Sequence, residues 1–309
     1  MVFATMLSVS GCSIGRKSQP GTVVESTAVQ PGCREEDYST RMERIGVLRS
    51  TDQGASWEFL GDACFRAPNL TPVDPSPLAF EDGVVLYFLD IISIINPGGN
   101  STIYSAVTSD GMDFTQPTPA FGYPGVMTDP YILKLSDNTY RLYAAVSPDK
   151  GLATASSQDG IKFDVNKNVD LIPGATPDAL LLPDNRIRLF VAGVDGITSL
   201  LSSSDGLTFS KESGVRIPPS EARVTDPHPI RLREGGYLMT FVVQPLGEFK
   251  TNRERLAALK MYLAKSSDGL TWTANPTPIG RGSVPGLVET ADGTLYIYFV
   301  DVTYTWAPI

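Results

Sequence analysis

The stretch Ser50-Thr51-Asp52-Gln53-Gly54-Ala55-Ser56-Trp57 contains the pattern on which the fold of this chain depends. Four copies, each one residue shorter, keep its hydroxyl residue, aspartate, glycine and final aromatic residue; they are residues 108–114, 157–163, 203–209 and 266–272. We call these five segments the aspartate turns. In such a turn the aspartate accepts backbone N–H groups, and glycine adopts a positive φ without steric cost. Five copies spaced about 46 to 63 residues apart indicate a repeat protein built from short β-strands.

A second pattern alternates with the aspartate turns. It is an X-Pro-Z triplet, followed eight residues after X by an acidic residue and then Gly or Asn. The triplets are Asp74-Pro75-Ser76, Asp129-Pro130-Tyr131, Thr176-Pro177-Asp178, Asp226-Pro227-His228 and Val284-Pro285-Gly286. The turns are Asp82-Gly83, Asp137-Asn138, Asp184-Asn185, Glu234-Gly235 and Asp292-Gly293. Short apolar runs lie on both sides of each turn, which is typical of a β-hairpin.

Each repeat therefore predicts four antiparallel strands, here called A to D. The triplet lies at the start of A, and the aspartate turn joins C to D. Four such strands form one blade of a β-propeller. The chain begins with strands C and D alone, in residues 44–61, and ends with strands A and B alone, in residues 284–302. We predict an all-β, five-bladed β-propeller over residues 40–305, closed by pairing of N-terminal strands with C-terminal strands.

The aspartate turns resemble the Asp-box (BNR repeat) of sialidases and other propellers. Five blades with Asp-Pro at the inner strands resemble the arabinanase, levansucrase and invertase group of glycoside hydrolases, in particular its family-43-like members. This resemblance implies that Asp74 is the catalytic base and that Asp129 adjusts the pKa of the acid. The family's general acid is a glutamate at the position of Thr176, so Asp178 or Asp226 would have to take its place.

We expect the site at the start of the A strands, because functional residues of repeat scaffolds gather around the central funnel. Side chains alternate along a strand, so X and Z should face the same side. The residues that this brings to one mouth are Asp74, Asp129, Tyr131, Asp178, Asp226 and His228. Clustered carboxylates raise one another's pKa, and glycoside hydrolysis needs one carboxyl that keeps its proton. Alternatively, Asp-Pro is a structural turn device in which proline fixes φ.

Two further patterns concern ligands. Phe65-Arg66-Ala67-Pro68 resembles the motif that supplies one sialidase arginine, so Arg66 and Arg223 join Tyr131 and His228 as candidate substrate-binding residues. A sialidase is less favoured, because sialidases have six blades and their motif precedes the first Asp-box. No metal or other cofactor is predicted from the residues. His228 is a weak metal-ligand candidate, since the resemblance allows for Ca²⁺ in the central funnel.

The N-terminus predicts export. Val9-Ser10-Gly11-Cys12 resembles a bacterial lipobox, in which the chain is cut before a cysteine that then carries lipid. Residues 1–11 would be the signal peptide, although no Lys or Arg precedes the apolar stretch, and residues 12–39 a flexible tether. An oxidising compartment favours a disulfide between Cys33 and Cys64. We therefore expect a membrane-anchored lipoprotein of the cell envelope or periplasm.

The composition of the chain limits the classes of ligand and partner that we expect. The net charge of −9, with 25 Lys and Arg against 34 Asp and Glu, argues against a nucleic-acid-binding protein. One histidine excludes a three-histidine metal site, and no apolar run is long enough to cross a membrane. We expect a monomer that acts on or binds an oligosaccharide or polysaccharide and touches the membrane only through its lipid. The alternative is a non-catalytic cell-surface scaffold that binds protein or glycan.

Overall fold

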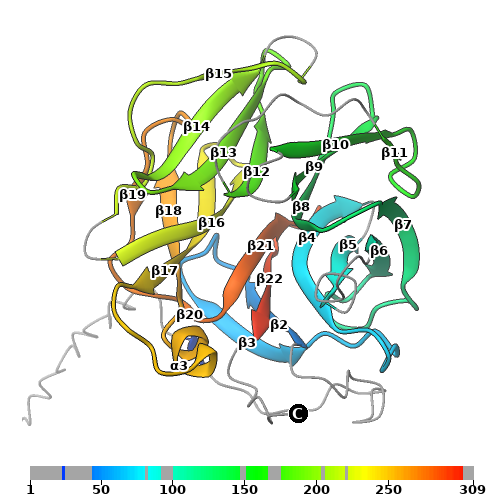
Figure 1. The fold of residues 1–309 in the computed structure, drawn as a ribbon, viewed down its shortest axis with the longest axis horizontal. Helices are drawn as coiled ribbons and strands as arrows, with labels where there is room; N and C mark the ends of the chain where they lie inside the picture. The colour runs from blue at the N-terminus through cyan, green and yellow to red at the C-terminus, as the bar shows by residue number, and fades with distance from the viewer. Residues whose placement is uncertain are drawn as a thin grey trace, which may run out of the picture.

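The predicted five-bladed β-propeller is confirmed. The computed structural model describes residues 23–24, 44–80, 83–91, 100–146, 151–165, 175–202, 206–219 and 222–301. Within them, five antiparallel sheets form a ring whose centre is nearest to the five A strands (Figure 1). Each A strand contacts the A strands of both neighbouring blades. None of the described helices is long and apolar enough to span a membrane.

Four blades follow one another along the chain, with strands in the order A to D from the axis outwards. Blade 1 contains β4 (Pro72–Phe80), β5 (Gly83–Asp90), β6 (Ser101–Thr108) and β7 (Thr118–Tyr123). Blade 2 contains β8 (Met127–Lys134), β9 (Tyr140–Val146), β10 (Leu152–Ser157) and β11 (Asp164–Val165). Blade 3 contains β12 (Ala175–Leu181), β13 (Ile187–Gly193), β14 (Gly196–Ser202) and β15 (Phe209–Lys211). Blade 4 contains β16 (Ala222–Arg231), β17 (Tyr237–Pro245), β18 (Lys260–Ser266) and β19 (Thr273–Ala274). A short helix, α3 (Asn252–Ala257), lies between β17 and β18, and β20 (Gly280–Arg281) also pairs with β18.

Blade 5 closes the ring with strands from both ends of the chain. It combines β21 (Ser283–Glu289) and β22 (Leu295–Asp301) with β2 (Arg44–Ser50) and β3 (Trp57–Asp62). The seam is the antiparallel pair β2–β22, which runs from Arg44 opposite Asp301 to Ser50 opposite Leu295. The predicted closure is therefore confirmed. A two-residue strand, β1 (Val23–Val24), pairs in parallel with β3 and falls within the segment expected to be a tether.

The B strands are buried on both faces, which explains their unbroken apolar runs. Residues 84–89 of β5 are all buried, because a B strand lies in the middle of its sheet and a neighbouring blade packs on each side. Three B-strand tyrosines also bind the next aspartate turn. Their hydroxyls donate from Tyr87 to the Gly160 carbonyl (2.7 Å), from Tyr143 to that of Gly206 (2.7 Å), and from Tyr298 to that of Gly111 (3.0 Å). The aspartate turns of blades 1, 2 and 3 thus attach these blades to the blade before them.

The aspartate turns have the local hydrogen bonds that the sequence predicts. In the last copy, Asp268 Oδ1 accepts from the backbone N–H groups of Leu270 (2.8 Å) and Thr271 (2.7 Å). These backbone hydrogen bonds lower the pKa of Asp268. Asp205 of the fourth copy lies outside the described residues.

Candidate functional site

The X residue of every triplet has a left-handed backbone. The φ angles are 52° at Asp74, 50° at Asp129, 52° at Thr176, 52° at Asp226 and 48° at Val284. Each A strand also changes its pairing register between the residue before X and Z. This is a β-bulge, so simple alternation of side chains does not apply across the triplet. We expected X and Z to face the same side because side chains alternate along a strand, and this reason is wrong. The bulge determines where the two side chains lie.

X side chains link neighbouring blades at the axis. Asp74 Oδ2 accepts a hydrogen bond from the backbone N–H of Asp129 in the next blade. Thr176 Oγ1 accepts in the same way from the N–H of Asp226, and the Asp226 carboxylate accepts from the N–H of Val284. We call these three hydrogen bonds the axial links. Among the described residues Asp129 makes no such bond to Thr176, so its carboxylate does not join two blades.

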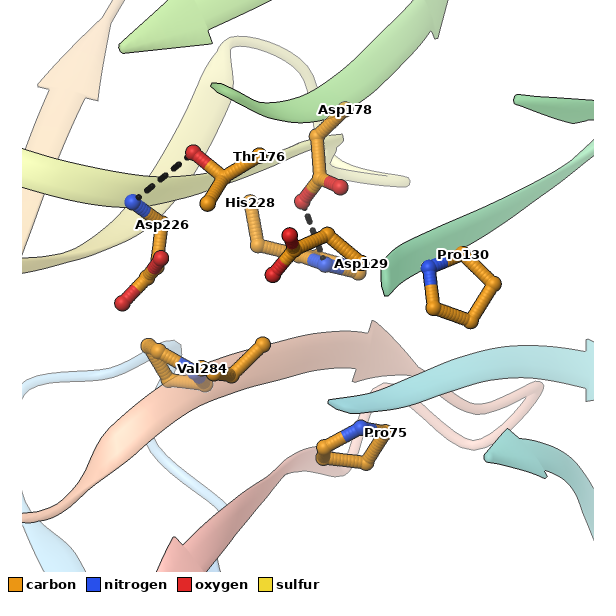
Figure 2. Close-up of a pocket in the computed structure, with 9 residues that line it drawn as sticks. Pro75, Asp129, Pro130, Thr176, Asp178, Asp226, His228 and Val284 are labelled. Atoms are coloured by element: carbon orange, nitrogen blue, oxygen red, sulfur yellow. Dashed lines mark hydrogen bonds and ion pairs between the residues drawn. The ribbon is translucent and has the colours of Figure 1, made fainter. Parts of the chain in front are cut away.

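The bulged ends of the A strands surround a small cavity at the axis (Figure 2). It is lined by the X residues Asp129, Thr176, Asp226 and Val284, the Z residues Asp178 and His228, and the prolines Pro75, Pro130 and Pro285. Its volume of about 20 Å³ is enough for roughly one water molecule. The cavity lies at the end of the A strands away from their A–B turns, because X precedes the residues that pair nearest to those turns. The aspartate turns lie at the A–B end, since β6 ends opposite the start of β5.

Two Z residues from neighbouring blades form a pair in which the histidine is buried and the aspartate partly buried. His228 Nδ1 of blade 4 lies 2.8 Å from Asp178 Oδ2 of blade 3, and only 5% of the histidine side chain is exposed. The ring of Tyr131, the Z residue of blade 2, meets the His228 ring edge to face with centroids 5.1 Å apart. Tyr131 supports the histidine and does not line the cavity. Three blades thus fix the position of one imidazole.

The cavity aspartates differ electrostatically from those of the turns. Burial raises the pKa of Asp226 to about 7, with the Asp129 charge as the next cause. Burial also raises the pKa of Asp178 to about 6, although the contact with His228 opposes that rise. The pKa of Asp129 is raised by burial as well. The site therefore holds carboxyl groups that resist ionisation, whereas Asp268 in its exposed turn ionises more readily than usual.

The described residues do not fit the Ca²⁺ ion for which the resemblance allows. No group of three His, Cys, Asp or Glu side chains within them could hold a metal ion. The contacts agree with this, because Ca²⁺ takes six to eight oxygen ligands. Asp178 binds His228, while Asp74 and Asp226 accept backbone N–H groups.

The structure brings together some of the predicted site residues and separates others. Asp129, Asp178, Asp226 and His228 line the cavity, and Asp74 lies next to it through its bond to Asp129. The two candidate arginines do not line it. Arg66 is ion-paired with Asp113 in the aspartate turn of blade 1, where its Nη2 lies 2.7 Å from Asp113 Oδ2. Arg223 is exposed at the beginning of β16.

Predictions on the N-terminal cysteines concern residues outside the described part of the chain. Cys12 and Cys33 both lie there. Cys64 is buried and disulfide-bonded. Its pairing with Cys33 stays a prediction.

Sequence reasoning missed that Asp178 and His228 bind one another. The available signal was their common Z position in consecutive blades, because the ring places equivalent residues of neighbouring A strands side by side. It also treated Thr176 only as a replaced acid, whereas its hydroxyl forms an axial link.

Comparison with known proteins rests on structure alone. No family model and no curated protein matches the chain. A thermostable family-43 glycoside hydrolase aligns with a TM-score of 0.55 at 14% identity, over 74% of this chain and 88% of that one. The chain has the fold of the family-43-like glycoside hydrolases. An endo-arabinase from Bacteroides thetaiotaomicron aligns with a TM-score of 0.54 at 14% identity, over 76% of this chain and 94% of that one. An endo-1,4-β-xylanase from the same organism gives 0.56 at 12% identity, over 75% and 85%.

Proposed function

We propose that this protein hydrolyses a glycosidic bond at the mouth of the axial cavity, with Asp226 as the proton donor. The observation that carries the proposal is the partly buried group of Asp129, Asp178 and Asp226 around the axial cavity, whose pKa values are all raised while the pKa of the turn residue Asp268 is lowered. A general acid must hold its proton near neutral pH, and a pKa of about 7 gives Asp226 that property.

The size of the cavity decides where the sugar binds. A space for roughly one water molecule cannot contain a sugar ring, so the ring lies across the mouth. A water molecule inside the cavity would then lie on the protein side of the scissile bond. Because the similar folds include an endo-arabinase and a xylanase, pentose polymers are the first substrates to test.

The experiment is a hydrolysis screen of the purified protein. The probes are 4-nitrophenyl α-L-arabinofuranoside, 4-nitrophenyl β-D-xylopyranoside, arabinan and xylan. We expect release of nitrophenol or of reducing ends, and a loss of about 100-fold or more in Asp226→Asn when the leaving group is a sugar. Asp164→Asn, at an exposed position in β11, is the matched control and should keep full activity. Asp226→Asn as active as wild type on the polymers would contradict the assignment of the donor.

A second candidate function is glycan binding without hydrolysis. Thr176 favours it, because the residue at the family's acid position is engaged in an axial link to Asp226. Asp74, at the family's base position, also forms an axial link, because its carboxylate accepts the backbone N–H of Asp129. This candidate predicts binding on a glycan array, abolished by blocking the cavity mouth with Val284→Trp, and no product from any probe.

We also propose that the chain is exported and anchored by lipid at Cys12. The lipobox-like stretch and the resemblance of the aspartate turns to the Asp-box support a protein that meets glycans outside the cytoplasm. A disulfide at Cys64 fits an oxidising compartment. Metabolic labelling with a fatty acid, compared between wild type and Cys12→Ser, tests the anchor.

A further inference from the structure

His228 is the only histidine of the chain and lies almost fully buried at the axial cavity. Buried polar groups are normally hydrogen-bonded, so each of its two ring nitrogens must be accounted for. Nδ1 donates to Asp178 Oδ2 at 2.8 Å. A carboxylate partner of this kind fixes the orientation and the tautomer of an imidazole.

The second ring nitrogen, Nε2, has no such partner among the described residues. No described residue forms a hydrogen bond with Nε2, and the ring also packs against that of Tyr131. With the proton on Nδ1, the Nε2 atom of the neutral ring carries a free lone pair. The side chain lines a cavity that has room for about one water molecule. The groups around that space, Asp129 and Asp226, supply the further polar partners that a bound water needs.

Asp74 is less well placed to activate such a water. It does not line the cavity, and its Oδ2 accepts the N–H of Asp129. The base that the family resemblance implies is thus engaged in joining two blades, while a buried imidazole lies at the water-sized space itself.

We propose that the Asp178–His228 pair, and not Asp74, is the general base of the reaction. The inference rests on the proposed hydrolysis. His228 Nε2 takes a proton from water as the water oxygen bonds to the anomeric carbon. The glycosidic C–O bond breaks, and its electron pair takes the proton of Asp226. The Asp178 carboxylate stabilises the resulting imidazolium, whose proton then returns through solvent to Asp226. Asp178 is a positioning residue, and His228 the group that acts on the reacting water.

The first test needs no substrate. Because the chain holds one histidine, ¹⁵N-labelled protein without an affinity tag gives a single pair of imidazole nitrogen signals. At pH 8 we expect a protonated Nδ1 and a bare Nε2, and loss of this tautomer preference in Asp178→Leu. A wild-type ring protonated at Nε2 instead would overturn the proposal, since such a ring cannot accept a proton from water there.

The second test separates the base from the acid by chemistry. With the 4-nitrophenyl glycoside that the wild type cleaves, His228→Ala should lose about 100-fold in kcat and regain activity with azide, a nucleophile that needs no base. The recovered product should be the glycosyl azide. Asp226→Asn should retain most of its activity on this good leaving group and lose it on xylan or arabinan. His228→Gln, which can still donate to Asp178, controls for packing and should be as inactive as His228→Ala.

The outcomes distinguish this proposal from the proposed function. If His228→Ala keeps its activity, or if azide rescues Asp74→Asn and not His228→Ala, the base is not the Asp178–His228 pair although the enzyme is a glycosidase. If the folded wild type cleaves none of the probes, the proposed hydrolysis and this base assignment fail together. Circular dichroism of each variant confirms that it is folded.

Discussion

Asp74 Oδ2 lies 3.1 Å from the backbone nitrogen of Asp129 and accepts its hydrogen bond across the boundary between blades 1 and 2. The bond explains why an aspartate with a left-handed backbone stands at this position. Asp and Asn tolerate that conformation better than other residues with a side chain, and their short side chain can accept a nearby N–H. Asp74 therefore has a structural role in joining blades 1 and 2, whether or not it also takes part in catalysis.

Replacing Asp74 should affect stability according to what replaces it. Asp74→Asn keeps an acceptor oxygen and tolerates the positive φ, so we expect a free energy of unfolding within about 1 kcal/mol of wild type. Asp74→Ala leaves the Asp129 N–H unpaired and adds backbone strain, so it should cost about 2–4 kcal/mol. Urea denaturation measures both. Equal losses in the two variants would show that the axial link contributes nothing.

Gly286 should tolerate no side chain, because it is where blade 5 meets blade 1. A Cβ atom there would lie 2.3 Å from Pro77 Cδ and 2.5 Å from the Pro75 carbonyl oxygen. Gly286→Ala should therefore destabilise the ring by about 1–3 kcal/mol, as overpacking does. Gly122→Ala in β7 is the matched control, since a Cβ atom added at Gly122 would meet no other atom within 4 Å. Thermal unfolding of the two variants should differ clearly, and matching melting temperatures would contradict the close approach.

The hydroxyl of Tyr143 should contribute to stability and that of Tyr140 should not. Tyr143 donates to the Gly206 carbonyl of the next blade, so Tyr143→Phe should cost about 1 kcal/mol. Tyr140 is buried in the same strand, and no described residue binds its hydroxyl, so Tyr140→Phe should be neutral. Chemical denaturation of both variants checks the difference. A neutral Tyr143→Phe would mean that the aspartate turn docks by packing alone.

Stability should fall as pH rises through the range in which Asp226 ionises. Its pKa is raised to about 7 in the folded chain from an ordinary value of 3.8. The folded state therefore holds a proton that the unfolded state has released, and stability decreases as pH increases from about 4 to about 7. In Asp226→Asn the decrease in the free energy of unfolding with pH should be smaller. The variant should gain most stability relative to wild type at pH 8. Unfolding free energies measured from pH 4 to 8 test the sign. An unchanged slope would assign the dependence to another group.

Cys64 should be joined to Cys33 in the exported protein. Non-reducing proteolysis and mass spectrometry should recover one linked peptide pair that disappears on reduction, and Cys33→Ser should leave a free thiol at Cys64. A linked pair containing Cys12 would contradict both this pairing and the lipid anchor, because an acylated Cys12 cannot form a disulfide.

The blade count and the closure could be predicted because each pattern recurs five times, and every X-Pro-Z triplet has its acidic turn residue eight positions after X. Turn chemistry is local, so the Asp268 turn forms the bonds that its own residues dictate. The arrangement of the site was harder to predict from the sequence, because its contacts join residues of different blades. The Asp178–His228 pair depends on how far each bulge rotates its strand, which no local pattern encodes. The ion pair of Arg66 could not be predicted for a similar reason, since its partner Asp113 is 47 residues away.

The axial links join blade 1 to blade 2, and blades 3, 4 and 5 to one another, through Asp74, Thr176 and Asp226. Within the described residues, no link crosses from blade 2 to blade 3, and Val284 has no acceptor to offer blade 1. At these two boundaries, the hydroxyls of Tyr143 and Tyr298 form the hydrogen bonds between blades, farther from the axis. The ring is thus held by two belts of hydrogen bonds, an inner belt at the axis and an outer belt at the aspartate turns. Where the inner belt is interrupted the outer one continues, so every boundary between blades is crossed by at least one directional bond.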